Sequence, residues 1–141
     1  MVLSIIIGGF ALNESLGLLS FMALSLGVFF QLVVHTHDIR DMEGDKREGC
    51  YTLPVLLGRK IPIIFAAVGY VILFVFPLLG VFHFNFNFFF PVVMLFFSFI
   101  GLRKLVKVWS SESAAKEFVE VRIMNRISTI VFALLFSLAL L

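Results

Sequence analysis

Long uncharged stretches alternate with short polar segments along most of this chain. The stretches that lack Asp, Glu, Lys and Arg are Leu16–Val34, Ile61–Phe82, His83–Leu102 and Ile127–Leu141. About 20 apolar residues in a helix cross the roughly 30 Å hydrocarbon core of a membrane, and a lone segment satisfies its own backbone there only as a helix. The pattern therefore predicts an all-α fold, a polytopic transmembrane helical bundle of about four spans.

A further apolar run, Met1–Leu12, stands at the start of the sequence. No basic residue precedes it, and only Asn13–Ser15 separates it from the next apolar stretch, which is not the layout of a signal peptide. We interpret it as a partial N-terminal span, the back end of a helix whose front end is missing.

The composition supports a membrane protein. Hydrophobic residues make up 61% of the 141 positions and charged residues 14%, and the mean hydropathy is +1.10, whereas soluble domains average about 25% charged residues. A net charge of +2 is too small to suggest nucleic-acid binding. The single cysteine, Cys50, permits no internal disulfide.

All 11 Lys and Arg residues fall in two segments, His35–Lys60 and Arg103–Arg126. Two predicted spans separate these segments, so both lie on one side of the membrane, and basic loops favour the cytoplasm. We expect a multi-pass protein of the cell membrane with a cytoplasmic motif loop at 35–60 and a cytoplasmic amphipathic loop at 103–126. The second loop predicts a short helix on the membrane surface, entered through a cap in Ser110–Ser113.

The first loop carries three aspartates at helical spacing. Asp38, Asp41 and Asp45 stand at i, i+3 and i+7, which places them within roughly 60° of one another on a helix. Three carboxylates on one stripe repel each other, and a divalent cation would remove the repulsion. Carboxylates on a helix, completed by phosphate oxygens of a substrate, are a common way to hold Mg²⁺.

The other face of the same predicted helix carries Arg40, Glu43 and Arg47. Their spacing allows Glu43 to pair with Arg40 at i−3 and with Arg47 at i+4. We therefore expect the three aspartates to receive no neutralisation from their own helix. An EF-hand is excluded. With Asp41 as the first loop position, glycine would be required at position 6, where Lys46 stands, and glutamate at position 12, where Thr52 stands.

The aspartates are part of a longer string that resembles the second aspartate-rich motif of the UbiA superfamily of intramembrane prenyltransferases. The string is Asp38-x-x-Asp41-x-x-x-Asp45-x-x-x-Gly49-x-x-Thr52-Leu-Pro-x-x-x-Gly58. In that family the motif lies at the cytoplasmic end of the sixth of nine helices. The resemblance makes residues 1–141 the C-terminal part of a UbiA-type domain, with Leu16–Val34 as the sixth helix and Met1–Leu12 as the tail of the fifth.

The resemblance implies transfer of an isoprenyl group from a prenyl diphosphate to a lipid or aromatic acceptor, with Mg²⁺ as the cofactor. Asp38, Asp41 and Asp45 match metal-binding positions of the family. Lys46 and Lys104 are candidate contacts for the substrate diphosphate. The other interpretation is that they are solvated lysines near anionic lipid headgroups. No residue is assigned as a catalytic acid or base.

The family's first aspartate-rich motif has no counterpart here, because Glu14 is the only acid before Asp38. Half of the expected metal site is therefore missing. We expect the chain either to be a fragment or to work with a partner chain that supplies the missing N-terminal half, and we expect no catalysis from it alone.

The form of the motif favours members that prenylate geranylgeranylglyceryl phosphate in archaeal ether-lipid synthesis. Quinone-type and other aromatic prenyltransferases of the same family carry similar strings and remain an alternative. A non-enzymatic membrane subunit, for assembly or transport, is a second alternative. A transporter would usually bury ionisable residues within its spans, and the full spans predicted here contain none.

Overall fold

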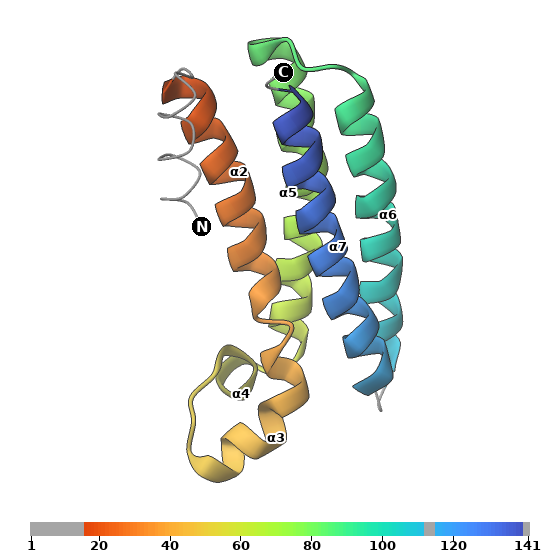
Figure 1. Cartoon of the computed structure of the whole chain (residues 1–141). Coiled ribbons are helices and arrows are strands. Elements are labelled where there is room, and N and C mark those ends of the chain that lie inside the picture. The colour runs from red at the N-terminus through yellow and green to blue at the C-terminus, as the bar shows by residue number, and fades with distance from the viewer. Residues whose placement is uncertain (1–15, 112–114, 140–141) are drawn as a thin grey trace.

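The computed structural model describes residues 16–111 and 115–139, and every element in them is a helix (Figure 1). The prediction of an all-α helical bundle is confirmed. The partial span predicted at Met1–Leu12 lies outside the described residues. The helices are α2 (Leu16–Val34), α3 (Asp38–Glu48), α4 (Leu53–Leu57), α5 (Lys60–Phe84), α6 (Phe89–Ser110) and α7 (Ala115–Ala139).

The four long helices run side by side, and the short helices α3 and α4 lie together at one end of the bundle (Figure 1). Helix α5 packs against both α2 and α6, and α6 also packs against α7, whereas α2 and α7 meet only sparsely. The end of α6 and the start of α7 lie at the same end as α3 and α4. Both basic segments of the sequence are therefore on one side of the bundle, as their charge distribution predicts.

Two helices of the described part, α5 and α6, are long and apolar enough to cross a membrane by themselves. A third span is possible if α2 and α3, which meet at a bend of 54°, count together. Helix α7 is not one of these candidate spans in its described residues. Its first half carries the charges of Glu120, Arg122 and Arg126. Its second half covers the predicted span at Ile127–Leu141 as far as Ala139.

The short surface helix predicted within 103–126 is wrong as a separate element. Helix α6 continues to Ser110, and a single α7 runs through the junction between Arg126 and Ile127 without a break. No glycine or proline stands within α7 to end a helix there. The cap expected in the serine-rich stretch falls partly on residues 112–114, outside the described residues.

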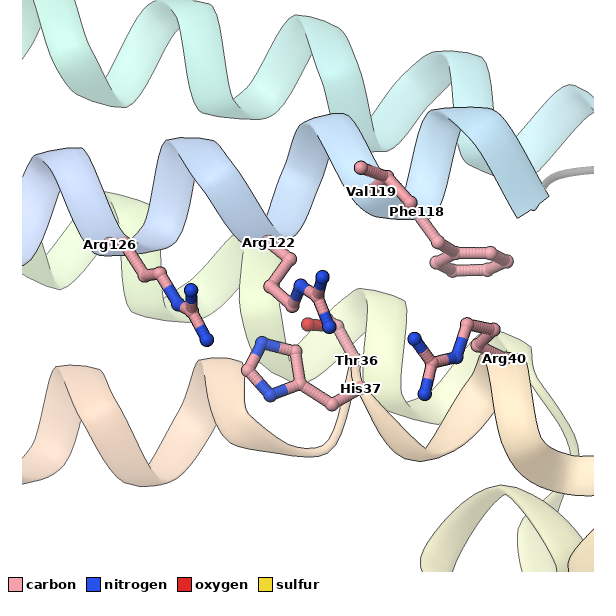
Figure 2. Close-up of a pocket in the computed structure, with 7 residues that line it drawn as sticks. All are labelled: Thr36, His37, Arg40, Phe118, Val119, Arg122 and Arg126. Atoms are coloured by element: carbon pink, nitrogen blue, oxygen red, sulfur yellow. The ribbon is translucent and has the colours of Figure 1, made fainter.

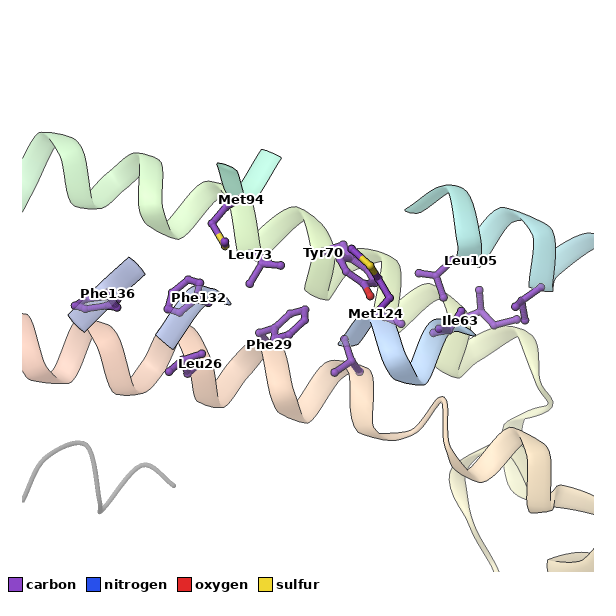
Figure 3. Close-up of a cluster of buried hydrophobic side chains, with 14 of the residues drawn as sticks. Leu26, Phe29, Ile63, Tyr70, Leu73, Met94, Leu105, Met124, Phe132 and Phe136 are labelled. Atoms are coloured by element: carbon purple, nitrogen blue, oxygen red, sulfur yellow. The ribbon is translucent and has the colours of Figure 1, made fainter. Parts of the chain in front are cut away.

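Small residues allow the helices to approach closely where the core is densest. A Cβ atom at Gly101 of α6 would lie 2.2 Å from the Tyr70 ring of α5, and one at Gly69 would lie 3.2 Å from side-chain atoms of Leu32 and Val33 on α2. Tyr70 is buried in the apolar cluster that fills the middle of the bundle (Figure 3). Such close backbone contacts are typical of helix packing in membranes.

A chain of buried hydrogen bonds connects this core to the turn between α2 and α3. The Tyr70 hydroxyl donates to Asn125 Oδ1 at 2.5 Å, and Asn125 Nδ2 donates to the Thr36 hydroxyl at 3.4 Å. Thr36 in turn donates to the carbonyl of Val33 at 2.7 Å. The bonds hold α7 and the α2–α3 turn at a common level.

Candidate active site

Helix α3 carries the aspartate motif and is attached to the bundle by one apolar residue. Ile39 is 7% exposed, whereas the other residues of α3 are exposed or only partly buried. The helix ends at Gly49, whose φ of 75° is left-handed, and the N–H of Cys50 donates to the carbonyl of Asp45 at 2.8 Å. This is a common way for a helix to end, and glycine adopts the conformation without strain.

The remaining motif residues position the loop after α3. Gly58 ends α4 with a φ of 80°, and no neighbouring atom lies where a Cβ would be added, so backbone conformation explains the glycine. Pro54 lies in the first turn of α4, where its missing N–H costs little. The Thr52 hydroxyl donates to Asp45 Oδ2 at 3.1 Å. The spacing from Asp45 to Thr52 is thus explained by a direct contact.

Asp38, Asp41 and Asp45, which we call the acidic stripe, lie along one side of α3, as their spacing predicts. Asp38 Oδ2 is 3.5 Å from His35 Nδ1. Asp45 is partly buried beside Thr52, and Asp41 is exposed. Within the described residues, no three His, Cys, Asp or Glu side chains are grouped closely enough to hold a metal ion by themselves.

The expectation that the acidic stripe receives no neutralisation from its own helix is wrong. Arg40 donates from Nε and Nη2 to the two carboxylate oxygens of Asp41, each at 2.8 Å. This bond holds the pKa of the Asp41 carboxyl below its usual value. Glu43 pairs with Arg47, at 3.9 Å. The long Arg40 side chain reaches Asp41 although the two residues are about 100° apart around the helix, and Glu43 is left to Arg47.

Three guanidinium groups meet in an open cavity between the α2–α3 turn and α7. Arg122 and Arg126 point from α7 toward the turn, and Arg40 points from α3 toward Arg122 (Figure 2). We call these three side chains the arginine cluster. The cavity has a volume of about 90 Å³, and its lining includes Thr36 and His37. Its chemistry is therefore suited to an anion.

His37 stands at the centre of this cavity (Figure 2). Burial lowers the pKa of its imidazole, and the charges of Arg122 and Arg126 lower it further. The Nε2 atom is buried and has no hydrogen-bond partner in the described part of the chain. A buried ring nitrogen without a partner is costly, so the site has an unmet capacity to bind a polar group.

A second, larger cavity of about 340 Å³ adjoins the first between α2 and α7, where these helices meet only sparsely. Most of its lining is apolar, and the two cavities share His37 and Arg126. The apolar residues on the α2 side are Phe30, Val33 and Val34. Together the cavities form a site with a cationic end and a hydrocarbon-lined end.

Comparison with known proteins identifies the family of the chain. The model of the UbiA prenyltransferase family matches residues 1–139. The chain belongs to this family. Members of the UbiA family generally use a divalent metal ion.

A curated relative of the UbiA chain is the digeranylgeranylglyceryl phosphate synthase of Methanobrevibacter smithii. The two sequences are 35% identical over 122 residues, which cover 81% of this chain and 42% of the relative. The UbiA chain thus spans less than half the length of the curated relative that it matches. No solved structure matches the chain.

The acidic stripe of this UbiA chain fits a divalent metal in its donor chemistry. Asp45 Oδ2 accepts from Thr52, which fixes the carboxylate and leaves its Oδ1 atom available. Asp38 is next to His35, and Asp41 is engaged by Arg40. One or two carboxylates completed by phosphate oxygens and water are the usual protein contribution to a Mg²⁺ site. Asp38 and Asp45 are two turns apart on α3, about 10.5 Å along its axis, so they would serve different ions or a site completed by other groups, and the role of each aspartate stays a prediction.

The two lysines proposed for the diphosphate occupy different environments. Lys46 is exposed in the last turn of α3. The Lys104 ammonium lies 2.7 Å from Glu120 Oε2 and connects α6 to α7. Their role toward the diphosphate stays a prediction. Arg59 also joins the helix ends, because it donates to the carbonyls of Val108 and Ser111.

The sequence interpretation missed the arginine cluster. The spacing along α3 predicts Arg40 on the face opposite the aspartates, and Arg122 and Arg126 enter the sequence analysis only as part of the basic segment Arg103–Arg126. A signal was available in the spacing of Arg122 and Arg126, since i and i+4 residues share a helix face. The meeting of that face with the residues before Asp38 requires the tertiary structure.

Proposed function

We propose that this chain contributes one half of the active site of a magnesium-dependent prenyltransferase. The reaction transfers an isoprenyl group from a prenyl diphosphate to geranylgeranylglyceryl phosphate, the acceptor that the motif favours. The name of the Methanobrevibacter smithii relative supports a step in ether-lipid synthesis. The observation that carries the proposal is the acidic stripe, in which Asp45 is fixed by Thr52 within a family motif.

In this proposal the chain's own residues bind and orient the substrates. Asp38, Asp41 and Asp45 would contribute ligands to Mg²⁺, which when bound stabilises negative charge on the departing diphosphate. Thr52 fixes the rotamer of Asp45, and Arg40 keeps Asp41 ionised. The bond between C1 of the prenyl chain and the diphosphate breaks, the acceptor oxygen bonds to C1, and the departing diphosphate takes the proton of the acceptor hydroxyl and leaves as inorganic diphosphate. The apolar walls keep water from competing for C1.

The first test is prenyl transfer from geranylgeranyl diphosphate. The chain is expressed alone and together with a chain that bears the family's first aspartate-rich motif, taken from the Methanobrevibacter smithii relative. We expect digeranylgeranylglyceryl phosphate only from the combined chains, and no product after chelation of Mg²⁺ with EDTA. Activity of the purified single chain, or activity that survives EDTA, would contradict the proposal. Prenyl transfer to 4-hydroxybenzoate but not to geranylgeranylglyceryl phosphate would show that the chain belongs to a prenyltransferase of aromatic acceptors.

We also propose that the end of the bundle carrying α3 and α4 faces the cytoplasm. The charge distribution supports this, because both basic segments lie at that end. Cys50 is a native probe, since it is exposed and is the only thiol of the sequence. A membrane-impermeant maleimide should label it in inside-out vesicles and not in intact cells. Labelling of intact cells would reverse the orientation.

A further inference from the structure

Positive charge exceeds negative charge around the cavity of the arginine cluster, where the nearby carboxylate of Asp41 is bonded to Arg40 and also interacts with the charge of Arg122. Among the side chains that the structure describes, none makes a hydrogen bond or ion pair with Arg122 or Arg126. Arg40 uses two of its five N–H groups on Asp41. Like charges that line one cavity raise one another's electrostatic energy, and an anion between them would lower it.

The shape of the two adjoining cavities indicates what kind of anion fits. His37 and Arg126 line both of them, so the cationic end opens directly into the apolar space beside Thr129 and Ile130. A small inorganic anion would occupy the first cavity and leave the second unfilled. An amphiphile with a charged head and a hydrocarbon chain matches both.

Guanidinium groups are suited to phosphate because their N–H groups form paired, charge-assisted hydrogen bonds with its oxygens. They do so without a metal ion. The acidic stripe is the opposite case, because carboxylates hold a phosphate only through a cation. The arginine cluster can therefore bind a phosphate directly, whereas the acidic stripe can bind one only through a metal ion.

We propose that the arginine cluster binds the phosphomonoester of a lipid whose hydrocarbon chain lies in the adjoining cavity between α2 and α7. This assignment rests on the proposed function: the lipid is the acceptor of the prenyl group, and its phosphate is not consumed in the reaction. The donor diphosphate then belongs to the acidic stripe. Arg40 contacts Asp41 and lines the cationic cavity, so the two phosphate groups lie next to each other along α3.

The test is direct binding to the chain in phosphatidylcholine nanodiscs that contain EDTA. The probe is radiolabelled geranylgeranylglyceryl phosphate, and the matched ligand is geranylgeranylglycerol, which lacks only the phosphate. We expect metal-independent binding of the phosphate lipid, and binding of the alcohol that is weaker by about ten-fold or more, as for a charge-assisted hydrogen bond. Equal affinity for both lipids would overturn the proposal, and this comparison needs no variant.

The variants locate the site. Arg122→Gln and Arg126→Gln should each weaken binding of the phosphate lipid about ten-fold and leave binding of the alcohol unchanged. The matched control is Arg103→Gln, since Arg103 is exposed on α6 and lines neither cavity. An equal loss of binding in the Arg103→Gln control would show a general effect of removing positive charge, and would overturn the assignment of the arginine cluster as the binding site.

Two competitors separate the sources of phosphate. Geranylgeranyl diphosphate should compete poorly in EDTA, and phosphatidylglycerol in the nanodisc should not displace the probe. Stronger competition by geranylgeranyl diphosphate would show that the arginine cluster binds the donor. Displacement by phosphatidylglycerol would show that the cluster binds the headgroups of ordinary membrane lipids. Either result would overturn the assignment while leaving the magnesium-dependent transfer reaction intact.

Discussion

The acidic stripe and the arginine cluster lie next to each other but are built in different ways. The stripe comes from one helix of 11 residues, and the contact that fixes Asp45 comes from Thr52, seven positions away. The cluster combines Arg40 with Arg122 and Arg126, and its geometry depends on how α7 packs near the α2–α3 turn. A local motif therefore defines the first site, and helix packing defines the second.

The comparison predicts that the two sites respond to different substitutions and ligands. The largest effect is expected for Asp45→Asn, assayed with the combined chains. It should lower prenyl transfer by about 100-fold or more, because even indirect partners of a metal ion are worth about 10–100-fold. The matched control is Glu43→Gln, which removes the same charge from the other face of α3 and should leave turnover unchanged. Equal losses in the two variants would contradict the assignment of the stripe.

Arg126→Gln should have the next largest effect, and only on one substrate. We expect the KM for geranylgeranylglyceryl phosphate to rise about ten-fold, while the KM for geranylgeranyl diphosphate and the dependence on Mg²⁺ stay the same. Initial rates measured while each substrate is varied in turn provide the check. A rise in the KM for geranylgeranyl diphosphate alone would show that Arg126 acts on the donor, and would contradict the separation of the two sites.

A smaller effect is expected for Thr52→Val, which removes the hydroxyl that contacts Asp45. A hydrogen bond contributes about 1 kcal/mol, so the Mg²⁺ concentration for half-maximal rate should rise about five-fold. Thr52→Ser keeps the hydroxyl and should restore the response. A change in acceptor KM with an unaltered Mg²⁺ response would show that the distinction between the sites is wrong.

Much of the acidic site could be predicted from the sequence because its geometry repeats along one helix. The placement of Asp38, Asp41 and Asp45 along one side of α3 follows from helical spacing, whereas the positive φ values of Gly49 and Gly58 at the ends of α3 and α4 are known only from the structure. The metal assignment itself is a prediction still to be tested. The pairing of Arg40 was predicted incorrectly, because spacing does not decide between a long side chain's two acidic neighbours.

The arginine cluster and the continuity of α7 could not be predicted in the same way. Arg122 and Arg126 stand more than 80 positions from Arg40 in the sequence, and no pattern in one segment reports what packs against it. The polar first half of α7 resembles a surface helix when it is considered alone. Its contacts with α6 and with the α2–α3 turn make it part of the same long helix as the apolar second half.

The hydrogen bonds from Tyr70 through Asn125 to Thr36 also set the register of α7. A helix rises 1.5 Å per residue, so a slip of α7 by one turn would carry Asn125 about 5.4 Å along the bundle and break its hydrogen bonds with Tyr70 and Thr36. Apolar faces alone would tolerate such a slip, because one hydrocarbon side chain replaces another at little cost, whereas a buried asparagine admits a single alignment. Since Arg122 and Arg126 flank Asn125 in the sequence, the same alignment decides the height at which their charges stand in the bundle.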